Sequence, residues 1–244
     1  MSTGSFASSR WWVVGTCFGL AIAGLLLGGM LILASGFLLV GVFGVEPTPL
    51  LQLGVSLLAI QGVAFPTVGF VYLRYANRSP RSFIPVSIPT PGELGVVFGG
   101  LLGIFVLTAI GASVLMLVTT TEPAANTAGQ TAQENPEIIP YLIPLVFLLN
   151  APGEELLFRG VIQGRLRERF AAWPAILLTT AAFAPLHIVA LVGSPLAAAM
   201  TVTIISIPSV VFGYAYERAE NLLVPVLMHA LFNSTLFLGI FISS

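Results

Sequence analysis

Seven long apolar runs constrain what this chain can fold into. Hydrophobic residues make up 57% of its 244 residues and charged residues only 8%, whereas soluble domains use about 45–50% apolar residues. A run of about 20 apolar residues is long enough to cross the hydrocarbon core of a bilayer as a helix. Windows of that length predict seven spans, at residues 11–39, 50–73, 94–118, 138–161, 173–192, 196–216 and 222–242. The sequence therefore predicts an all-α fold, a polytopic transmembrane helix bundle integral to the cell membrane.

Charge and cysteine content exclude other classes of protein. The formal net charge is −1, which gives no electrostatic reason to bind nucleic acid, so we expect membrane lipid rather than nucleic acid as a partner. Cys17 is the only cysteine, so an intramolecular disulfide is impossible. The apolar stretch at residues 11–45 is longer than the apolar part of a signal peptide, about 7–15 residues, and predicts an uncleaved first span.

The arginines predict the orientation of the bundle. Eight of the nine lie outside the spans: Arg10, Arg74, Arg78, Arg81, Arg165, Arg167, Arg169 and Arg218. With seven spans and a cytoplasmic N-terminus, all eight fall on the cytoplasmic side, as the positive-inside rule requires. The N-terminus is therefore predicted to be cytoplasmic, and the C-terminus to lie on the opposite side.

A polar segment divides the chain into two parts. Residues 119–137 are rich in Thr, Ala, Gln and Pro and have no apolar periodicity, which predicts a flexible extracytoplasmic loop. Residues 1–137 accordingly comprise spans one to three with this loop. Residues 138–244 form a four-helix core that carries the ionisable groups of the membrane interior.

Two adjacent acids and an arginine interrupt the fourth span. Ionisable residues within a membrane span are costly and are functional candidates by default. Glu155 and Arg159 are four residues apart, so their side chains share a helix face and can pair. Glu154 is rotated by about 100° from Glu155, so we expect the two acids not to face one partner. The alternative interpretation is a packing ion pair with Arg159 extended to the membrane surface.

The only two histidines lie in two further spans. His187 is four residues after Phe183, and His229 is four residues before Asn233. His229 and Asn233 share one helix face, so the imidazole and the carboxamide can converge on one bound atom. Phe183 lies one turn before His187 and is expected to be a packing wall. A lone histidine in a span is often a hydrogen-bonded packing contact, but two histidines and an acid pair together predict one polar site walled off from lipid.

Three motifs in this order resemble a known family. They are Glu154-Glu155-x-x-x-Arg159, Phe183-x-x-x-His187 and His229-x-x-x-Asn233. Their order and intervals resemble those of the CPBP/Abi (CAAX protease and bacteriocin-processing) family of intramembrane proteases, which includes the type II CAAX prenyl endopeptidases. The resemblance covers approximately residues 138–242, and the first three spans are only generically similar.

The resemblance implies an intramembrane endopeptidase and assigns roles to its residues. Glu154 resembles the catalytic acid and His187 its partner in activating water, while His229 and Asn233 resemble the groups that stabilise the oxyanion. The chemistry agrees, because a positioned carboxylate can act as a general base and an imidazole with a carboxamide can donate to a tetrahedral intermediate. Supporting or substrate-positioning roles fall to Glu155, Arg159 and Phe183.

The same residues leave the use of a metal open. The family is often labelled a metalloprotease family, and Glu154, His187 and His229 would form a His₂Glu set with an open water position, as in catalytic zinc sites. No His-Glu-x-x-His helix is present in the sequence. We favour a glutamate-activated water without a metal over zinc.

Two other functions stay open on the sequence alone. One is a non-catalytic membrane scaffold or bacteriocin-immunity protein of the same fold, and the other is a proton-coupled transporter, since Glu and His chains also line proton pathways. Internal repeats, which would favour transport, are not found in the sequence. For the protease, we expect a membrane-associated or lipidated, CAAX-like peptide or protein as substrate, with bacteriocin leaders as the alternative.

Overall fold

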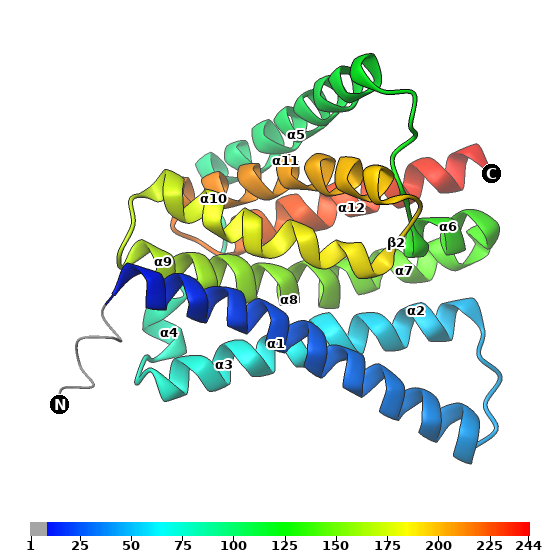
Figure 1. The fold of residues 1–244 in the computed structure, drawn as a ribbon. Helices are drawn as coiled ribbons and strands as arrows, with labels where there is room; N and C mark the ends of the chain where they lie inside the picture. Colours follow the sequence, from blue (N-terminus) through cyan, green and yellow to red (C-terminus); the bar gives the residue numbers. More distant parts are fainter. Residues whose placement is uncertain (1–8) are drawn as a thin grey trace.

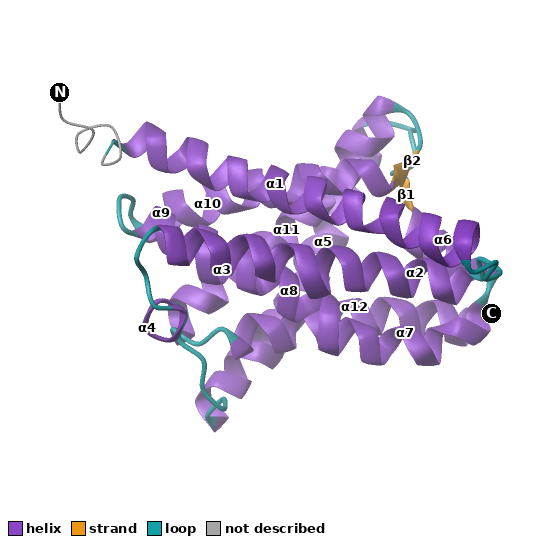
Figure 2. Ribbon diagram, turned by 90° about the horizontal axis from the view of Figure 1, so that it is seen from below, coloured by secondary structure: helices purple, strands orange, loops and turns teal. Residues whose placement is uncertain are grey.

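The computed structural model describes residues 9–244. Of these residues 83% are helical, and among them seven helices or runs of helical segments are long and apolar enough to cross a membrane. The all-α multi-pass prediction is thus confirmed. Figure 2 shows that the chain is helical almost throughout, with one short strand pair at one end of the bundle.

Spans one to three occupy the N-terminal half. Span one is α1 (Arg10–Gly36), continued by the π-helical segment η1 (Phe37–Val42). Span two consists of α2 (Pro49–Leu57), the π-helical segment η2 (Leu58–Ala64) and α3 (Phe65–Tyr75), and the short helix α4 (Pro80–Phe83) follows it. Span three is α5 (Pro91–Val118).

Spans four to seven follow the strand β1 (Ala125–Asn126) and α6 (Thr127–Glu134). Span four changes its helical form repeatedly: a 3₁₀ turn η3 (Pro136–Ile138), α7 (Ile139–Leu145), a π-helical η4 (Val146–Asn150), α8 (Ala151–Glu155), a π-helical η5 (Leu156–Gln163) and α9 (Gly164–Arg167). Span five is α10 (Ala172–Phe183) with the 3₁₀ segment η6 (Ala184–Ala190), which leads into β2 (Leu191–Val192). Spans six and seven are α11 (Pro195–Ala219) and α12 (Leu223–Ser243).

Three spans begin at a Ser-Pro or Thr-Pro dipeptide. The side chains of Thr48, Thr90 and Ser194 each accept a hydrogen bond from a backbone N–H in the first turn of the helix that follows. The proline comes next, where its missing N–H is not needed. These polar caps lie outside the apolar windows, so the helices begin slightly earlier than hydropathy predicts.

Span four runs through the middle of the bundle. In Figure 1 it lies between α1 and α3 on one side and α10, α11 and α12 on the other. Half of its most apolar window is buried inside the protein, against 6% for span one. A span surrounded by other helices rather than by lipid can carry polar groups at lower cost, because its neighbours supply hydrogen-bond partners.

The segment at residues 119–137 is not the flexible loop that its composition predicts. Asn126 caps α6 by accepting from the backbone N–H of Ala128 and Gly129. Ala132 of α6 is fully buried in a small apolar cluster with Ile138, Ile139 and Leu142, and β1 pairs antiparallel with β2. The prediction of a flexible loop did not foresee β1 and α6, because one buried alanine and one cap are too weak a signal to outweigh a polar composition.

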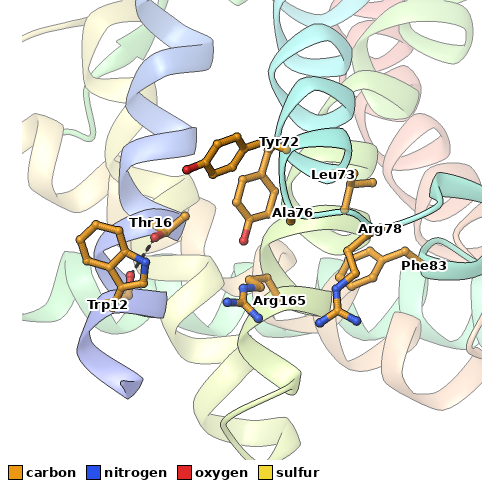
Figure 3. Close-up of a pocket in the computed structure, with 9 residues that line it drawn as sticks. Trp12, Thr16, Tyr72, Leu73, Ala76, Arg78, Phe83 and Arg165 are labelled. Atoms are coloured by element: carbon orange, nitrogen blue, oxygen red, sulfur yellow. Dashed lines mark hydrogen bonds between the residues drawn. The ribbon is translucent and has the colours of Figure 1, made fainter. Parts of the chain in front are cut away.

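The arginine-bearing loops meet at one end of the bundle. Arg78 pairs with Glu168 at 2.8 Å, and Arg167 pairs with Glu217 at 2.8 Å, so the loops after spans two, four and six are in contact there. Figure 3 shows a hollow at this end, lined by Trp12, Tyr72, Arg78 and Arg165 among others. No residue of the three motifs lines it. The cytoplasmic assignment of this end stays a prediction.

Candidate active site

The acid pair sits where span four alternates between helix types. Pro152 has no backbone N–H to donate to the preceding turn, and the π-helical η4 ends two residues before it. The regular α8 is only five residues long, and the π-helical η5 follows Glu155 directly. Short π-helical segments inside α-helices are frequent at functional sites. Here the wider turns set the directions in which the two acids and Arg159 leave the helix.

Glu154 is buried and held by two side-chain amides. Its Oε1 accepts from Asn150 Nδ2 at 3.0 Å and from Gln61 Nε2 at 3.1 Å. Its other oxygen, Oε2, lies 3.8 Å from His229 Nε2. The carboxylate therefore has one oxygen occupied by fixed donors and one directed toward the imidazole.

Glu155 forms a fully buried ion pair with Arg159 and also contacts His229. Its Oε1 accepts from Arg159 Nη1 at 2.9 Å and lies 2.8 Å from His229 Nδ1, and neither Glu155 nor Arg159 has an exposed side chain. The predicted Glu155–Arg159 pair is confirmed, and Arg159 does not extend to the membrane surface. The expectation that the two acids would not face one partner was wrong, because His229 has a nitrogen on each side of its ring and directs one toward each acid.

Arg159 is anchored by span six as well. Its Nη2 donates to the backbone oxygen and to Oγ of Ser209, both at 2.9 Å. Its guanidinium lies over the rings of Phe183 at 5.0 Å and Phe212 at 5.4 Å. Cation–π contacts of this kind strengthen when water is excluded. A buried guanidinium is tolerated here because an acid, two oxygens and two aromatic faces surround it.

The contact with Glu155 determines the tautomer of His229. A carboxylate only accepts hydrogen bonds, so Nδ1 carries the proton that it donates to Glu155 Oε1. His229 Nε2 is then directed toward Glu154, and it donates only in the imidazolium form. The ring also stacks on Phe212, with centroids 4.8 Å apart and an angle of 18° between the planes, which fixes its orientation.

Asn233 is connected to Glu154 through Asn150. Asn233 Nδ2 donates to Asn150 Oδ1 at 2.8 Å, and Asn150 in turn donates to Glu154. His229 and Asn233 both point from α12 toward span four, as their four-residue spacing predicts. One N–H of the Asn233 amide is used in this contact, and a primary amide has two.

His187 stands apart from this cluster. The sequence predicts it on the same helix as Phe183, but α10 ends at Phe183 and His187 lies in the 3₁₀ segment η6. The two rings do meet edge to face at 4.8 Å, so Phe183 is the packing wall that the sequence predicts. Within residues 9–244 no hydrogen bond joins His187 to Glu154 or His229, and its buried Nδ1 has no partner. The ring of Phe183 contacts both His187 and the guanidinium of Arg159.

The predicted zinc ligands are not assembled as a group. Among the residues that the structure describes, no three His, Cys, Asp or Glu side chains are arranged to hold a metal ion. Glu154 and His229 are adjacent, but the third residue of the set, His187, lies on the 3₁₀ segment that begins where α10 ends. The donor set of a catalytic zinc site is therefore incomplete, and the residues do not fit the metal.

Sequence reasoning missed three polar residues of the site. Gln61 and Asn150 hold Glu154, and Ser209 holds Arg159. The signal that could have found Gln61 and Asn150 is the one used for the histidines, a polar side chain inside an apolar span. Serine is too common in spans to be singled out in this way.

Fold and site together define an integral multi-pass membrane protein with a buried cluster of two acids, an arginine and a histidine. Residues 136–235 match the family model described as type II CAAX prenyl endopeptidase Rce1-like. This segment is therefore similar to the Rce1-like family, which agrees with the resemblance seen in the motifs. Searches of curated proteins and of solved structures give no match to the chain.

Proposed function

We propose that the protein is an intramembrane endopeptidase that hydrolyses membrane-associated or lipidated, CAAX-like peptides with an activated water. The observation that carries this proposal is the buried carboxylate of Glu154, held by two amide donors and lying 3.8 Å from an imidazole nitrogen. A carboxylate and an imidazole held at this distance inside an apolar bundle match the needs of general acid–base catalysis better than those of packing.

Glu154 Oε2 is the proposed base. Because Oε1 already accepts from Gln61 and Asn150, Oε2 is the oxygen left to take a proton from water. The resulting hydroxide attacks the peptide carbonyl, and Glu154 then returns the proton to the leaving amine. His187, whose ring contacts Phe183 edge to face, is the proposed second group that orients this water.

His229 and Asn233 are the proposed oxyanion donors. His229 Nε2 lies 3.8 Å from Glu154 Oε2 and donates in the imidazolium form, and Asn233 retains one amide N–H beyond the one it gives to Asn150. Donors fixed in advance stabilise a developing oxyanion without reorganisation. Glu155 and Arg159 position the imidazole through Nδ1 rather than contact the substrate.

The proposed enzyme should cleave a lipidated peptide, and three variants test it. We expect purified wild type in detergent to cleave a prenylated peptide with a C-terminal CAAX sequence, with the products identified by mass. His187→Ala should reduce turnover by about 10²–10⁴-fold as a general acid–base group, and Asn233→Ala by about 10²–10³-fold as an oxyanion donor. Gln52→Ala, an exposed residue outside the site, is the control. Equal turnover by all four proteins would mean that a contaminant cleaves the peptide, and the scaffold and transporter alternatives would take precedence.

Catalysis without a metal is the second proposed property. It rests on the donor geometry: within residues 9–244 no three His, Cys, Asp or Glu side chains are arranged to hold a metal ion, and Glu155, which lies beside His229, already pairs with Arg159. We expect chelator treatment to leave turnover within about twofold and purified protein to carry zinc far below one ion per chain. Stoichiometric zinc, lost together with activity on chelation and restored by zinc, would contradict this.

A further inference from the structure

We propose that Gln61, on the second span, is a positioning residue that fixes the orientation of the Glu154 carboxylate for hydrolysis. The inference rests on the proposed function. It also extends the active site to the N-terminal half of the chain, because Gln61 lies outside residues 136–235 that match the Rce1-like family.

Two donors from different spans hold the same oxygen. Gln61 Nε2 donates to Glu154 Oε1 at 3.1 Å from span two, and Asn150 Nδ2 donates to it at 3.0 Å from within span four. Rotation of the carboxylate about its terminal bond would break both hydrogen bonds. Together the two amides therefore fix the plane of the carboxylate, so that its second oxygen points toward His229. Without Gln61, the donor that remains to this oxygen among residues 9–244 is Asn150, on the same span as Glu154.

The backbone holds Gln61 in place. A Cβ at Gly153 would overlap the backbone oxygen of Gln61, so only glycine permits this approach. Spans two and four thus touch backbone to backbone at the residue just before Glu154. The backbone that carries the Gln61 side chain is therefore held in place by its contact with Gly153. A positioning residue requires this kind of support.

Packing alone does not explain a glutamine at this position. The carboxylate of Glu154 only accepts, so the NH₂ end of the amide must face it. The other end, Oε1, is then buried without a hydrogen-bond partner, which lowers stability. A leucine would fill similar volume without that cost. The contact with Glu154 is therefore the feature that accounts for the glutamine.

Gln163 provides a matched control. It is also a buried glutamine, and its Nε2 donates to a carboxylate, Glu217 Oε1, at 2.9 Å and to the backbone oxygen of Gly213 at 3.0 Å. Neither partner belongs to the proposed site. The substitutions Gln61→Leu and Gln163→Leu therefore remove the same type of hydrogen bond, one from the proposed base and one from a structural acid.

The experiment compares kcat, KM and thermal stability of wild type, Gln61→Leu, Gln61→Glu and Gln163→Leu, with rates normalised to folded protein. We expect Gln61→Leu to lower kcat by about 10–100-fold, as for loss of a hydrogen bond to a charged group, with KM within about twofold. Gln61→Glu keeps the shape but places an acceptor against the carboxylate, so kcat should fall at least as far as in Gln61→Leu. If Gln61→Leu does not fold, the kcat of Gln61→Glu tests the role of Gln61. Gln163→Leu should keep the wild-type kcat.

Two outcomes would overturn the inference in different ways. An active wild type whose kcat per folded molecule is unchanged in both Gln61 variants leaves the proposed function standing and removes the role of Gln61. A wild type that cleaves no peptide removes the proposed function, and the role of Gln61 with it.

Discussion

Glu154→Gln should abolish most peptide hydrolysis while leaving the fold intact. The amide has nearly the shape of the carboxylate, and its oxygen can still accept from Gln61 and Asn150, so the bundle keeps its packing. It cannot take a proton from water, so turnover should fall by about 10²–10⁴-fold. The measurement is kcat on the prenylated peptide, with the melting temperature in detergent as the check on folding.

A matched substitution separates loss of the base from loss of a buried charge. Glu217 is also a carboxylate that accepts from a glutamine and an arginine, Gln163 and Arg167, but at the arginine end of the bundle. Glu217→Gln should retain wild-type turnover. If Glu154→Gln keeps more than about a tenth of the wild-type kcat, Glu154 is not the base.

Arg159→Leu should be the most destabilising single change in the cluster. It leaves Glu155 buried with His229 as its remaining side-chain partner and removes the two hydrogen bonds that Arg159 donates to Ser209. Breaking a buried ion pair by removing one partner costs about 3–5 kcal/mol. We expect a loss of that size in the free energy of unfolding, measured by denaturant titration in detergent, together with loss of activity.

The double variant Arg159→Leu/Glu155→Leu tests the cause. Replacing both members of a buried pair by apolar residues is often neutral, so the double variant should recover part of the stability and none of the activity. Arg167→Leu, which removes a half-exposed pair with Glu217, should cost less than about 1 kcal/mol. A cost for Arg159→Leu no larger than that for Arg167→Leu would show that the buried pair does not hold the bundle together.

The seven spans were predictable because the bilayer sets their length. Span three is predicted at residues 94–118 and is observed as α5 (Pro91–Val118), and the difference is the polar cap formed by Thr90 and Glu93. The segment at residues 119–137 was not predictable in the same way, because α6 is held by a cap and one buried alanine rather than by an apolar run.

Within the site, contacts along one helix were predictable and contacts between helices were not. Glu155 and Arg159 pair as their spacing requires, since four residues bring two side chains to one helix face. The sequence predicted only that His229 and the acids belong to one polar site, not which of their atoms are in contact. That its two nitrogens face Glu155 and Glu154 separately depends on how α12 packs against α8.

The sequence by itself determined the membrane class, the number of spans and the identity of the three motifs, because run length and residue spacing are local properties. Only the tertiary structure decided which groups meet: Gln61 at Glu154, Ser209 at Arg159, and His187 against the edge of Phe183. These contacts depend on how closely two backbones approach, as at Gly153 and Gln61, and on where a helix ends, as at Phe183. Neither the approach of two backbones nor the residue at which a helix ends can be read from residue spacing in the sequence.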